Sequence, residues 1–219
     1  KLDALGGIEW QKTFGGSSYD EGYEILQSPD SGYVVVGATE STDGDLSSNT
    51  LQGDADVWLL KLNSSGDVEW STNYGGSYND FGKAMCSDGA GGYVLACAVY
   101  SNDGDVTGHH GNFDVWVVRV DSVGGLVWQN AIGGTDGDHP ERIRRTSSGN
   151  FILTGRTYSD DWDVSDHIGQ ADYWTAQVSA SGVLQWASCL GGTDPDDSHS
   201  VVELDNGDFL ISGGSPSLD

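Results

Sequence analysis

The sequence predicts an all-β fold built from a repeated unit of four strands, and two observations support that prediction. Seven of the eight tryptophans fall in two series whose members are 58 or 60 residues apart: Trp10, Trp70, Trp128 and Trp186, and Trp58, Trp116 and Trp174. A Gly-Gly pair follows each member of the first series, and an aspartate lies four residues beyond that pair: Asp20, Asp80, Asp138 and Asp196. Self-similarity at a fixed period is the signature of a repeat architecture.

Each repeat is expected to contain the same elements in the same order. A glycine turn leads to a strand that ends in tryptophan (GGIEW, GDVEW, GGLVW, GVLQW). A short strand follows the recurrent aspartate, and then a nearly all-apolar strand (GYVVVG, GYVLAC, NFILTG, DFLISG), which we expect to be buried on both faces. A polar loop with DGD or DWD precedes the closing strand (DVWLLKL, DVWVVRV, DYWTAQV). Because no segment has a sustained helical period, almost no helix is expected.

Four-stranded units in tandem are typical of a β-propeller, so the predicted fold is a propeller of four-stranded blades. A β-solenoid is the competing architecture, but its coils are usually shorter than 58 to 60 residues. We place the units at 4–63, 64–121, 122–179 and 180–219, about 3.7 repeats, with the last unit lacking the equivalents of 44–60. Residues 1–219 therefore form a single propeller domain or, as we expect, a segment of a larger propeller.

The charge balance excludes some classes of partner. The 219 residues include 34 acidic and 9 basic side chains, for a formal net charge of -25. Nucleic-acid binding needs clustered bases, and docking on an anionic membrane needs a basic surface, so neither is expected. No apolar run reaches the length of a membrane-spanning helix, so no membrane insertion is expected. No signal peptide stands at the start, so we expect a mature or internal piece.

The three cysteines, Cys86, Cys97 and Cys189, have no CxxC spacing and are expected to be small buried side chains.

Three runs of residues carry a resemblance to a known family: WSTNYGGSYNDFGKAM, GGYVLACAVYSNDGD and FDVWVVRVDSVGGLVW. They resemble the bacterial β-propeller repeat of the SBBP type and related repeats of secreted and lipid-anchored Bacteroidetes proteins. The resemblance implies a secreted or surface-exposed propeller within a larger multidomain protein, with further blades or domains in the same polypeptide. It implies no catalytic residues.

The acidic loops are candidate calcium sites. Paired carboxylates on a glycine-relieved turn suit the hard oxygen preference of Ca²⁺. The alternative is that these aspartates cap their own turns and confer solubility. If calcium binds, we expect it to have a structural role, and no other cofactor is expected. The candidate ligands are Asp43, Asp45, Asp56, Asp103, Asp105, Asp114, Asp161, Asp163 and Asp172.

Candidate ligand-binding residues lie in the third repeat. Trp162 replaces the glycine of the other acidic loops and can stack on a sugar or anchor a protein partner. Alternatively, it covers its own blade. Arg142, Arg144 and Arg156 belong to a local basic cluster that can meet an acidic partner or a carboxylated sugar, or pair with aspartates of the chain itself.

The residues present in every repeat are expected to be structural. The recurrent aspartates are predicted to bond to the neighbouring blade, and the first tryptophan series to pack between blades with its indole N–H on a carbonyl. No catalytic residue is predicted, because no Ser-His-Asp order, HExxH or CxxC motif is present.

The sequence therefore predicts a non-enzymatic extracellular or cell-surface bacterial propeller that scaffolds, or binds a protein or carbohydrate. The alternatives are a structural subunit of a surface assembly or filament, and a propeller-type glycosidase, lyase or quinoprotein-like enzyme. The runs Asp3 to Trp10 and Asp121 to Trp128 faintly resemble quinoprotein repeats, but those repeats are shorter. An acid-rich chain offers many carboxylate pairs of the kind a glycosidase needs.

Overall fold

Residues 1–46 and 50–216 are described by a computed structural model, and their regular structure is almost entirely strand. The only helical segment of this described part is a single 3-10 turn, η1 (Gly44–Leu46). The first sheet contains β1 (Asp20–Gln27), β2 (Tyr33–Thr39), β3 (Asp56–Leu62) and β4 (Val68–Tyr74). The second contains β5 (Asp80–Ser87), β6 (Tyr93–Val99), β7 (Asp114–Val120) and β8 (Leu126–Ile132). The third contains β9 (Asp138–Arg145), β10 (Phe151–Thr157), β11 (Asp172–Val178) and β12 (Leu184–Leu190), and a hairpin follows of β13 (Asp197–Glu203) and β14 (Phe209–Gly214).

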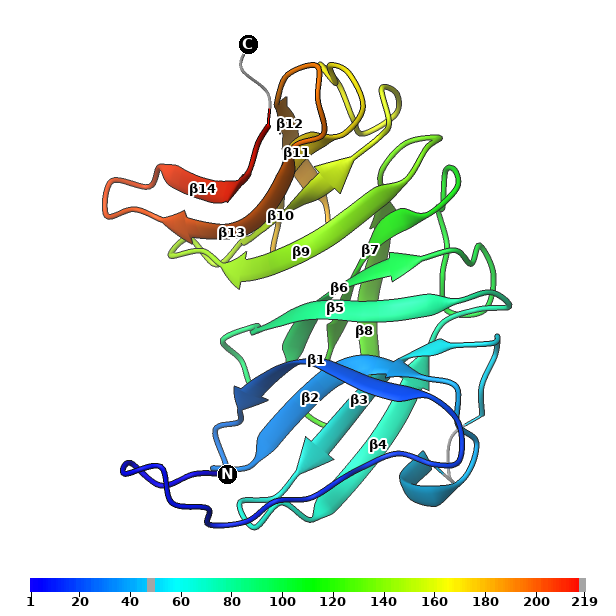
Figure 1. The fold of residues 1–219 in the computed structure, drawn as a ribbon, viewed down its shortest axis with the longest axis vertical. Coiled ribbons are helices and arrows are strands. Elements are labelled where there is room, and N and C mark those ends of the chain that lie inside the picture. Colours follow the sequence, from blue (N-terminus) through cyan, green and yellow to red (C-terminus); the bar gives the residue numbers. More distant parts are fainter. Residues whose placement is uncertain (47–49, 217–219) are drawn as a thin grey trace.

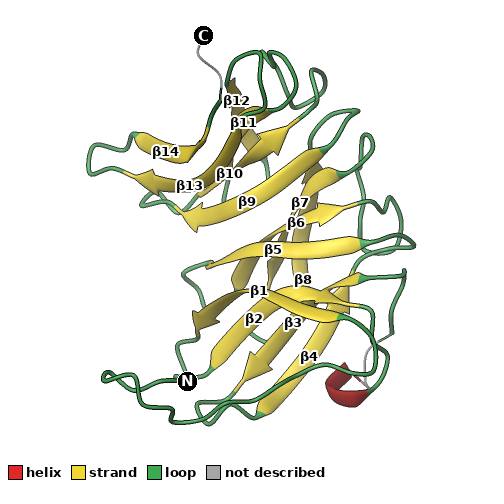
Figure 2. Cartoon of the chain, in the orientation of Figure 1, coloured by secondary structure: helices red, strands yellow, loops and turns green. Residues whose placement is uncertain are grey.

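The three sheets and the hairpin follow one another along the long axis of the molecule (Figures 1 and 2). Within every sheet, neighbouring strands in the chain pair antiparallel. The first strands of successive sheets lie side by side, β1 next to β5, β5 next to β9 and β9 next to β13 (Figure 1). The prediction of an all-β fold made of repeated four-stranded sheets with almost no helix is confirmed.

The sheets are offset by one strand from the units placed on the sequence. The unit 4–63 supplies β1, β2 and β3, whereas β4 comes from the next unit. The reason is the tight turn after β3, in which the Asn63 N–H donates to the Asp67 carbonyl at 2.9 Å and folds β4 back onto β3. The prediction that this strand ends in tryptophan is wrong, because Trp70 pairs with Lys61 and the ladder continues to Tyr74 opposite Val57.

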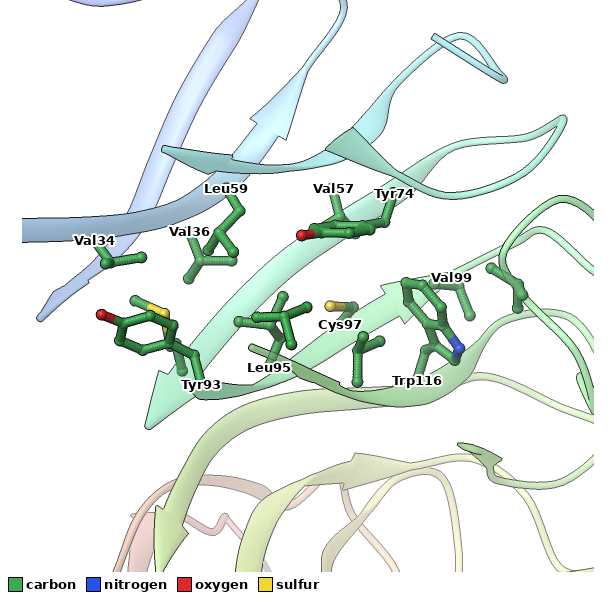
Figure 3. Close-up of a cluster of buried hydrophobic side chains, with 14 of the residues drawn as sticks. Val34, Val36, Val57, Leu59, Tyr74, Tyr93, Leu95, Cys97, Val99 and Trp116 are labelled. Carbon is green, nitrogen blue, oxygen red and sulfur yellow. The ribbon is translucent and has the colours of Figure 1, made fainter. Parts of the chain in front are cut away.

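The main core lies between facing sheets. Apolar side chains of the first sheet, including Val36, Leu59 and Tyr74, face Leu95 and Trp116 of the second sheet across their interface (Figure 3). The prediction that the apolar strands are buried on both faces is confirmed for β6 and nearly so for β10, whereas β2 is partly exposed on one face. It is wrong for β14, none of whose residues is buried, because no third strand covers that hairpin among the described residues. A second cluster fills the space between the second and third sheets.

The first tryptophan series packs between sheets, as the sequence predicts. The indole ring of Trp70 lies over Gly124 in the β7–β8 turn of the next sheet, and that of Trp128 lies over Gly182 one sheet further. The predicted indole hydrogen bond is present at Trp128, whose Nε1 donates to the Ala180 carbonyl at 3.2 Å. The equivalent Nε1 of Trp10 is buried without a partner in the described part of the chain.

The second tryptophan series differs in how its indole groups are satisfied. Trp58 Nε1 donates to Ser71 Oγ at 2.9 Å, and Trp116 Nε1 donates to the Gln129 side chain. Both acceptors lie thirteen residues after their tryptophan, where the third repeat has Ala187. Among the described residues the indole nitrogen of Trp174 therefore has no partner.

Supplying the missing acceptor is expected to stabilise the third sheet. We predict that Ala187→Ser raises the free energy of unfolding by about 1 kcal/mol, because a satisfied buried donor is worth about that much. The melting temperature should rise by roughly 2–4 °C in a protein of this size. The matched control is Ser71→Ala, which should lower stability by a similar amount. Unchanged stability of Ala187→Ser alongside a loss in Ser71→Ala would contradict this account.

Three of the recurrent aspartates hydrogen-bond to the neighbouring sheet, as predicted, through the backbone N–H of Asp80, Asp138 and Asp196. The carboxylates of all four, Asp20 included, also accept from the second glycine of the Gly-Gly pair. The carboxylate of Asp80 accepts hydrogen bonds from the Gly76 N–H at 2.8 Å and from Ser101 Oγ at 2.7 Å. Because Asp80 is opposite Val99, its carboxylate reaches the residues that follow β6. The bond to the neighbouring sheet is made by the Asp80 N–H, which donates to the carbonyl of Ala55.

Two further expectations concern the cysteines and membrane insertion. All three thiols are free, Cys86 and Cys97 being buried and Cys189 partly buried. Within the described residues no helix has the length and apolarity required to span a bilayer.

Candidate functional site

A β-bulge interrupts the first strand of every sheet at the same repeat position. In β5, Gly82 pairs with Cys97 and Ala84 pairs with Ala96, so Lys83 is an extra residue with no partner in the ladder. The equivalent extra residues of the other first strands are Tyr23, Glu141 and His199. Bulges re-aim a side chain and are enriched beside functional sites. The four bulged residues differ in chemical type, so this position breaks the symmetry of the repeat.

The bulged residues of the first three sheets converge on one pocket of about 510 Å³, a volume typical of small-ligand sites. The pocket lies along β1, β5 and β9, with the ends of β6 and β10 forming its wall. Its lining combines aromatic rings with cationic groups: Tyr23, Phe81, Lys83, Ala98, Tyr100, His139, Pro140, Glu141, Arg142 and Arg156.

Lys83 is held in this pocket by aromatic rings. Its ammonium lies 3.9 Å from the ring centroid of Tyr23 and 5.2 Å from that of Phe81, both within cation–π range. No ion pair within 4.0 Å joins this ammonium to a carboxylate of the described residues. Burial lowers the pKa of Lys83, and the carboxylates of Glu21 and Glu141 partly offset that effect. The result is a partly desolvated cation that no internal carboxylate neutralises at short range.

Arg156 adds a second cationic group with unused bonding capacity. Its Nη1 lies 3.0 Å from Asp197 Oδ2, whereas its Nε is buried and has no hydrogen-bond partner in the described part of the chain. Arg142 is a third cation at the same wall, and its Nη1 is 3.5 Å from Glu24 Oε1. The Arg156 side chain is 32% exposed and lines the pocket, so its guanidinium can be reached by a ligand.

An aromatic stack borders the pocket at the start of β9. The rings of Tyr100 and Phe113 have centroids 5.0 Å apart, and the rings of Phe113 and His139 have centroids 4.1 Å apart. Burial, assisted by the charges of Arg156 and Lys83, lowers the pKa of His139 to about 4. The imidazole is therefore neutral at pH 7, and it can both donate and accept a hydrogen bond.

The structure brings together only some of the predicted ligand-binding residues. Arg142 and Arg156 line the pocket, and Arg144 lies beside it with its Nη1 3.5 Å from Glu24 Oε1. Trp162 lies apart from this lining, 70% exposed, with its ring 4.7 Å from that of His110.

The backbone of Trp162 has a φ of 54°, a left-handed conformation. Gly44 and Gly104, its counterparts in the other acidic loops, have a φ of 64°. A tryptophan at this position carries a steric cost that glycine does not.

The aspartates of the acidic loops act as clamps on the Gly-Gly turns. Asp103 Oδ1 accepts from the Ser77 N–H at 2.7 Å, and Asp105 Oδ2 accepts from the Gly75 N–H at 3.2 Å. Asp43, Asp45 and Asp161 make the equivalent side-chain bonds, whereas Asp163 reaches its turn through a backbone N–H to the Gly133 carbonyl.

The remaining candidate calcium ligands start the third strand of each sheet and are buried: Asp56, Asp114 and Asp172. Each accepts a backbone N–H of the preceding loop, as Asp114 does from His110 at 2.7 Å. Burial raises the pKa of all three carboxyl groups. The described residues hold no cluster of three or more His, Cys, Asp or Glu side chains suited to a metal ion, and calcium binding stays a prediction.

The sequence did not predict the other eight lining residues of the pocket: Tyr23, Phe81, Lys83, Ala98, Tyr100, His139, Pro140 and Glu141. A signal for several of them was present in the repeat. From the recurrent aspartates the sequence reads D-E-G-Y, D-F-G-K, D-H-P-E and D-D-S-H, so the second and fourth positions differ in every copy. Residues shared by all repeats hold the fold, and a recognition site needs positions that are not shared. The sequence alone does not reveal the role of these positions, because a bulge, which turns the fourth position into the pocket, cannot be recognised without the strand register.

The fold and the pocket define a class of protein: a repeated all-β protein of antiparallel four-stranded sheets, with a pocket along their first strands. No family model matches the chain, so membership in the SBBP family stays a prediction.

Two known proteins are similar to this chain. A crystal structure of a Bacteroides caccae protein of unknown function has a TM-score of 0.53 at 12% sequence identity, covering 96% of this chain and 58% of that one. At this identity the likeness concerns the fold alone. The regulatory protein FlaEY of Caulobacter vibrioides is 26% identical over 193 residues, which cover 81% of this chain and 19% of FlaEY. The chain thus spans about a fifth of that relative and less than two thirds of the structural neighbour.

Proposed function

We propose that the chain is a non-enzymatic β-propeller module that works outside the cell or on the bacterial surface and binds a protein or carbohydrate ligand. The first strands of the blades would then face the central channel of the ring, with the pocket opening toward it. The observation that carries the proposal is the convergence of three unlike bulged residues, Tyr23, Lys83 and Glu141, on one pocket. In a repeat protein, the residues shared by all repeats hold the fold, and the positions that differ between repeats can give the ligand site its specificity.

Further support comes from the chain's composition and its relatives. An acidic surface with a net charge of -25 keeps a protein soluble and apart from nucleic acid. The relative and the structural neighbour are both considerably longer than the matched region, which agrees with a module of a larger protein.

The test is a binding screen that compares two tyrosine variants. Immobilised full chain is probed with a glycan array and with an array of bacterial surface proteins. Tyr100→Ala removes an aromatic wall of the pocket, and Tyr78→Ala removes an exposed tyrosine that lies outside it. We predict ligands that bind the wild type and Tyr78→Ala equally and Tyr100→Ala at least tenfold more weakly.

Three outcomes would contradict the proposal. One is the absence of any ligand, and another is binding that Tyr100→Ala leaves unchanged. The third is a defined oligomer in sedimentation together with no ligand, which would favour the surface-assembly alternative.

A further inference from the structure

The bases of this protein are concentrated around one pocket. Five of its nine lysines and arginines lie on β5, β9 and the end of β10: Lys83, Arg142, Arg144, Arg145 and Arg156. In a chain with a net charge of -25, this is where the scarce cations gather, with the carboxylates of Glu24, Glu141 and Asp197 lying among them.

Two of these cations keep unused capacity for an anion. The ammonium of Lys83 is packed on Tyr23 and Phe81, with no carboxylate of the described residues at ion-pair distance. The Nε of Arg156 is buried, and no acceptor among the described residues reaches it. Both groups line the same pocket, so one ligand carboxylate could bind the two together.

The other lining groups suit a sugar. Aromatic rings at Tyr23, Phe81 and Tyr100 present apolar faces on which the C–H surface of a pyranose can pack. The carboxylate of Glu141 and the neutral imidazole of His139 are available to sugar hydroxyls.

We propose that the pocket binds a carbohydrate that bears a carboxylate, such as a uronic acid residue. The carboxylate pairs with the Lys83 ammonium and the Arg156 guanidinium, and the sugar ring packs on the aromatic wall. This inference rests on the proposed binding function and names the chemical class of its ligand.

The test measures binding of digalacturonic acid to the full chain by calorimetry, with its neutral methyl ester as the paired probe. Lys83→Met keeps the aliphatic stem and removes the charge, and Arg156→Gln removes the guanidinium. We expect each variant to weaken binding of the acid at least tenfold, and the methyl ester to bind the wild type at least tenfold more weakly than the acid does. Rising salt should weaken binding of the acid, because one charge pair is partly exposed.

Two control variants and a fold check accompany the measurement. Arg145→Gln removes a base of β9 that does not line the pocket, and Trp162→Ala removes the exposed loop tryptophan. Both should bind digalacturonic acid as the wild type does. Unchanged far-UV circular dichroism and melting temperature establish that the Lys83 and Arg156 variants are folded.

Several results would overturn this inference and leave the proposed binding function standing. Equal binding of the methyl ester would show that the carboxylate is not recognised, and a loss confined to Trp162→Ala would place the site in the loop. Full displacement by an equal concentration of inorganic phosphate would show an anion site without sugar selectivity. Binding of a protein in the array screen with no binding of digalacturonic acid would likewise exclude the sugar, whereas failure of all ligands would remove both proposals.

Discussion

Replacing Trp116 with alanine is expected to lower the free energy of unfolding by about 4 kcal/mol, the usual cost of deleting a buried aromatic side chain. Trp116 is fully buried in the cluster that joins the first two sheets (Figure 3), where it is paired with Cys97 of the neighbouring strand. The melting temperature should fall by roughly 10 °C in a protein of this size. Urea unfolding, followed by tryptophan fluorescence and circular dichroism, measures the change.

The control for this substitution is Trp186→Ala, which removes a tryptophan that is 38% exposed and packs mainly on Phe209. It should cost about 1 kcal/mol, because less apolar surface returns to water. A finer comparison uses phenylalanine at Trp116 and Trp174. Trp116→Phe should cost about 1–2 kcal/mol more, because only Trp116 has an indole acceptor, Gln129, to leave unpaired. Equal losses at Trp116 and Trp186 would mean that the sheets are not held together by this cluster.

The second large effect concerns acid stability and two consecutive residues, Asp138 and His139. Burial raises the pKa of Asp138 from 3.8 to about 6 and lowers that of His139 from 6.5 to about 4. Asp138 binds its proton more tightly in the folded state, so its contribution to stability rises as pH falls from about 6 to 4. The neutral His139 of the folded state stabilises above pH 6.5, and that stability is lost as pH falls toward 4. In the wild type the two contributions oppose each other within nearly the same pH window.

Single substitutions should expose each contribution. In His139→Gln, stability relative to wild type should increase by about 1–2 kcal/mol between pH 6.5 and 4, because solvent at the partly exposed imidazole screens part of the effect. In Asp138→Asn it should decrease by about 2–3 kcal/mol over the same range. The slope with pH is the readout, because Asp138→Asn also loses hydrogen bonds and starts from a lower stability at pH 7. Urea titrations at pH 7, 6, 5 and 4 give these slopes. Two variants whose profiles run parallel to the wild type would refute the assignment.

The sequence predicts the fold well because the residues that recur in every repeat are the ones that pack the sheets together. Tryptophans such as Trp70 and Trp128 recur because each covers a glycine turn of the next sheet, and Asp80 recurs because it closes its Gly-Gly turn. Where the sequence misleads, register is the cause. The true end of the strand that contains Trp70 depends on which residues are opposite in the ladder, and there the strand continues to Tyr74.

The pocket is harder to predict for a related reason. Arg142 and Arg156 are conspicuous in the sequence because bases are rare in an acidic chain. Their common pocket with Lys83 is not visible there, because it is formed by two adjacent sheets. Trp162 stood out by the same reasoning and lies elsewhere. The sequence shows which side chains are unusual for this acidic repeat. Only the packing of the sheets determines which of those side chains lie in the same pocket.

The bulge shared by all first strands has an evolutionary consequence. A residue that no ladder hydrogen bond constrains can be exchanged for tyrosine, lysine, glutamate or histidine while the flanking pairs stay intact, as Tyr23, Lys83, Glu141 and His199 illustrate. Substitutions at these positions can change binding specificity with little loss of folding stability. The fold thus stays constant while the four bulge positions vary. Directed evolution could randomise those four codons together to change which ligand is bound.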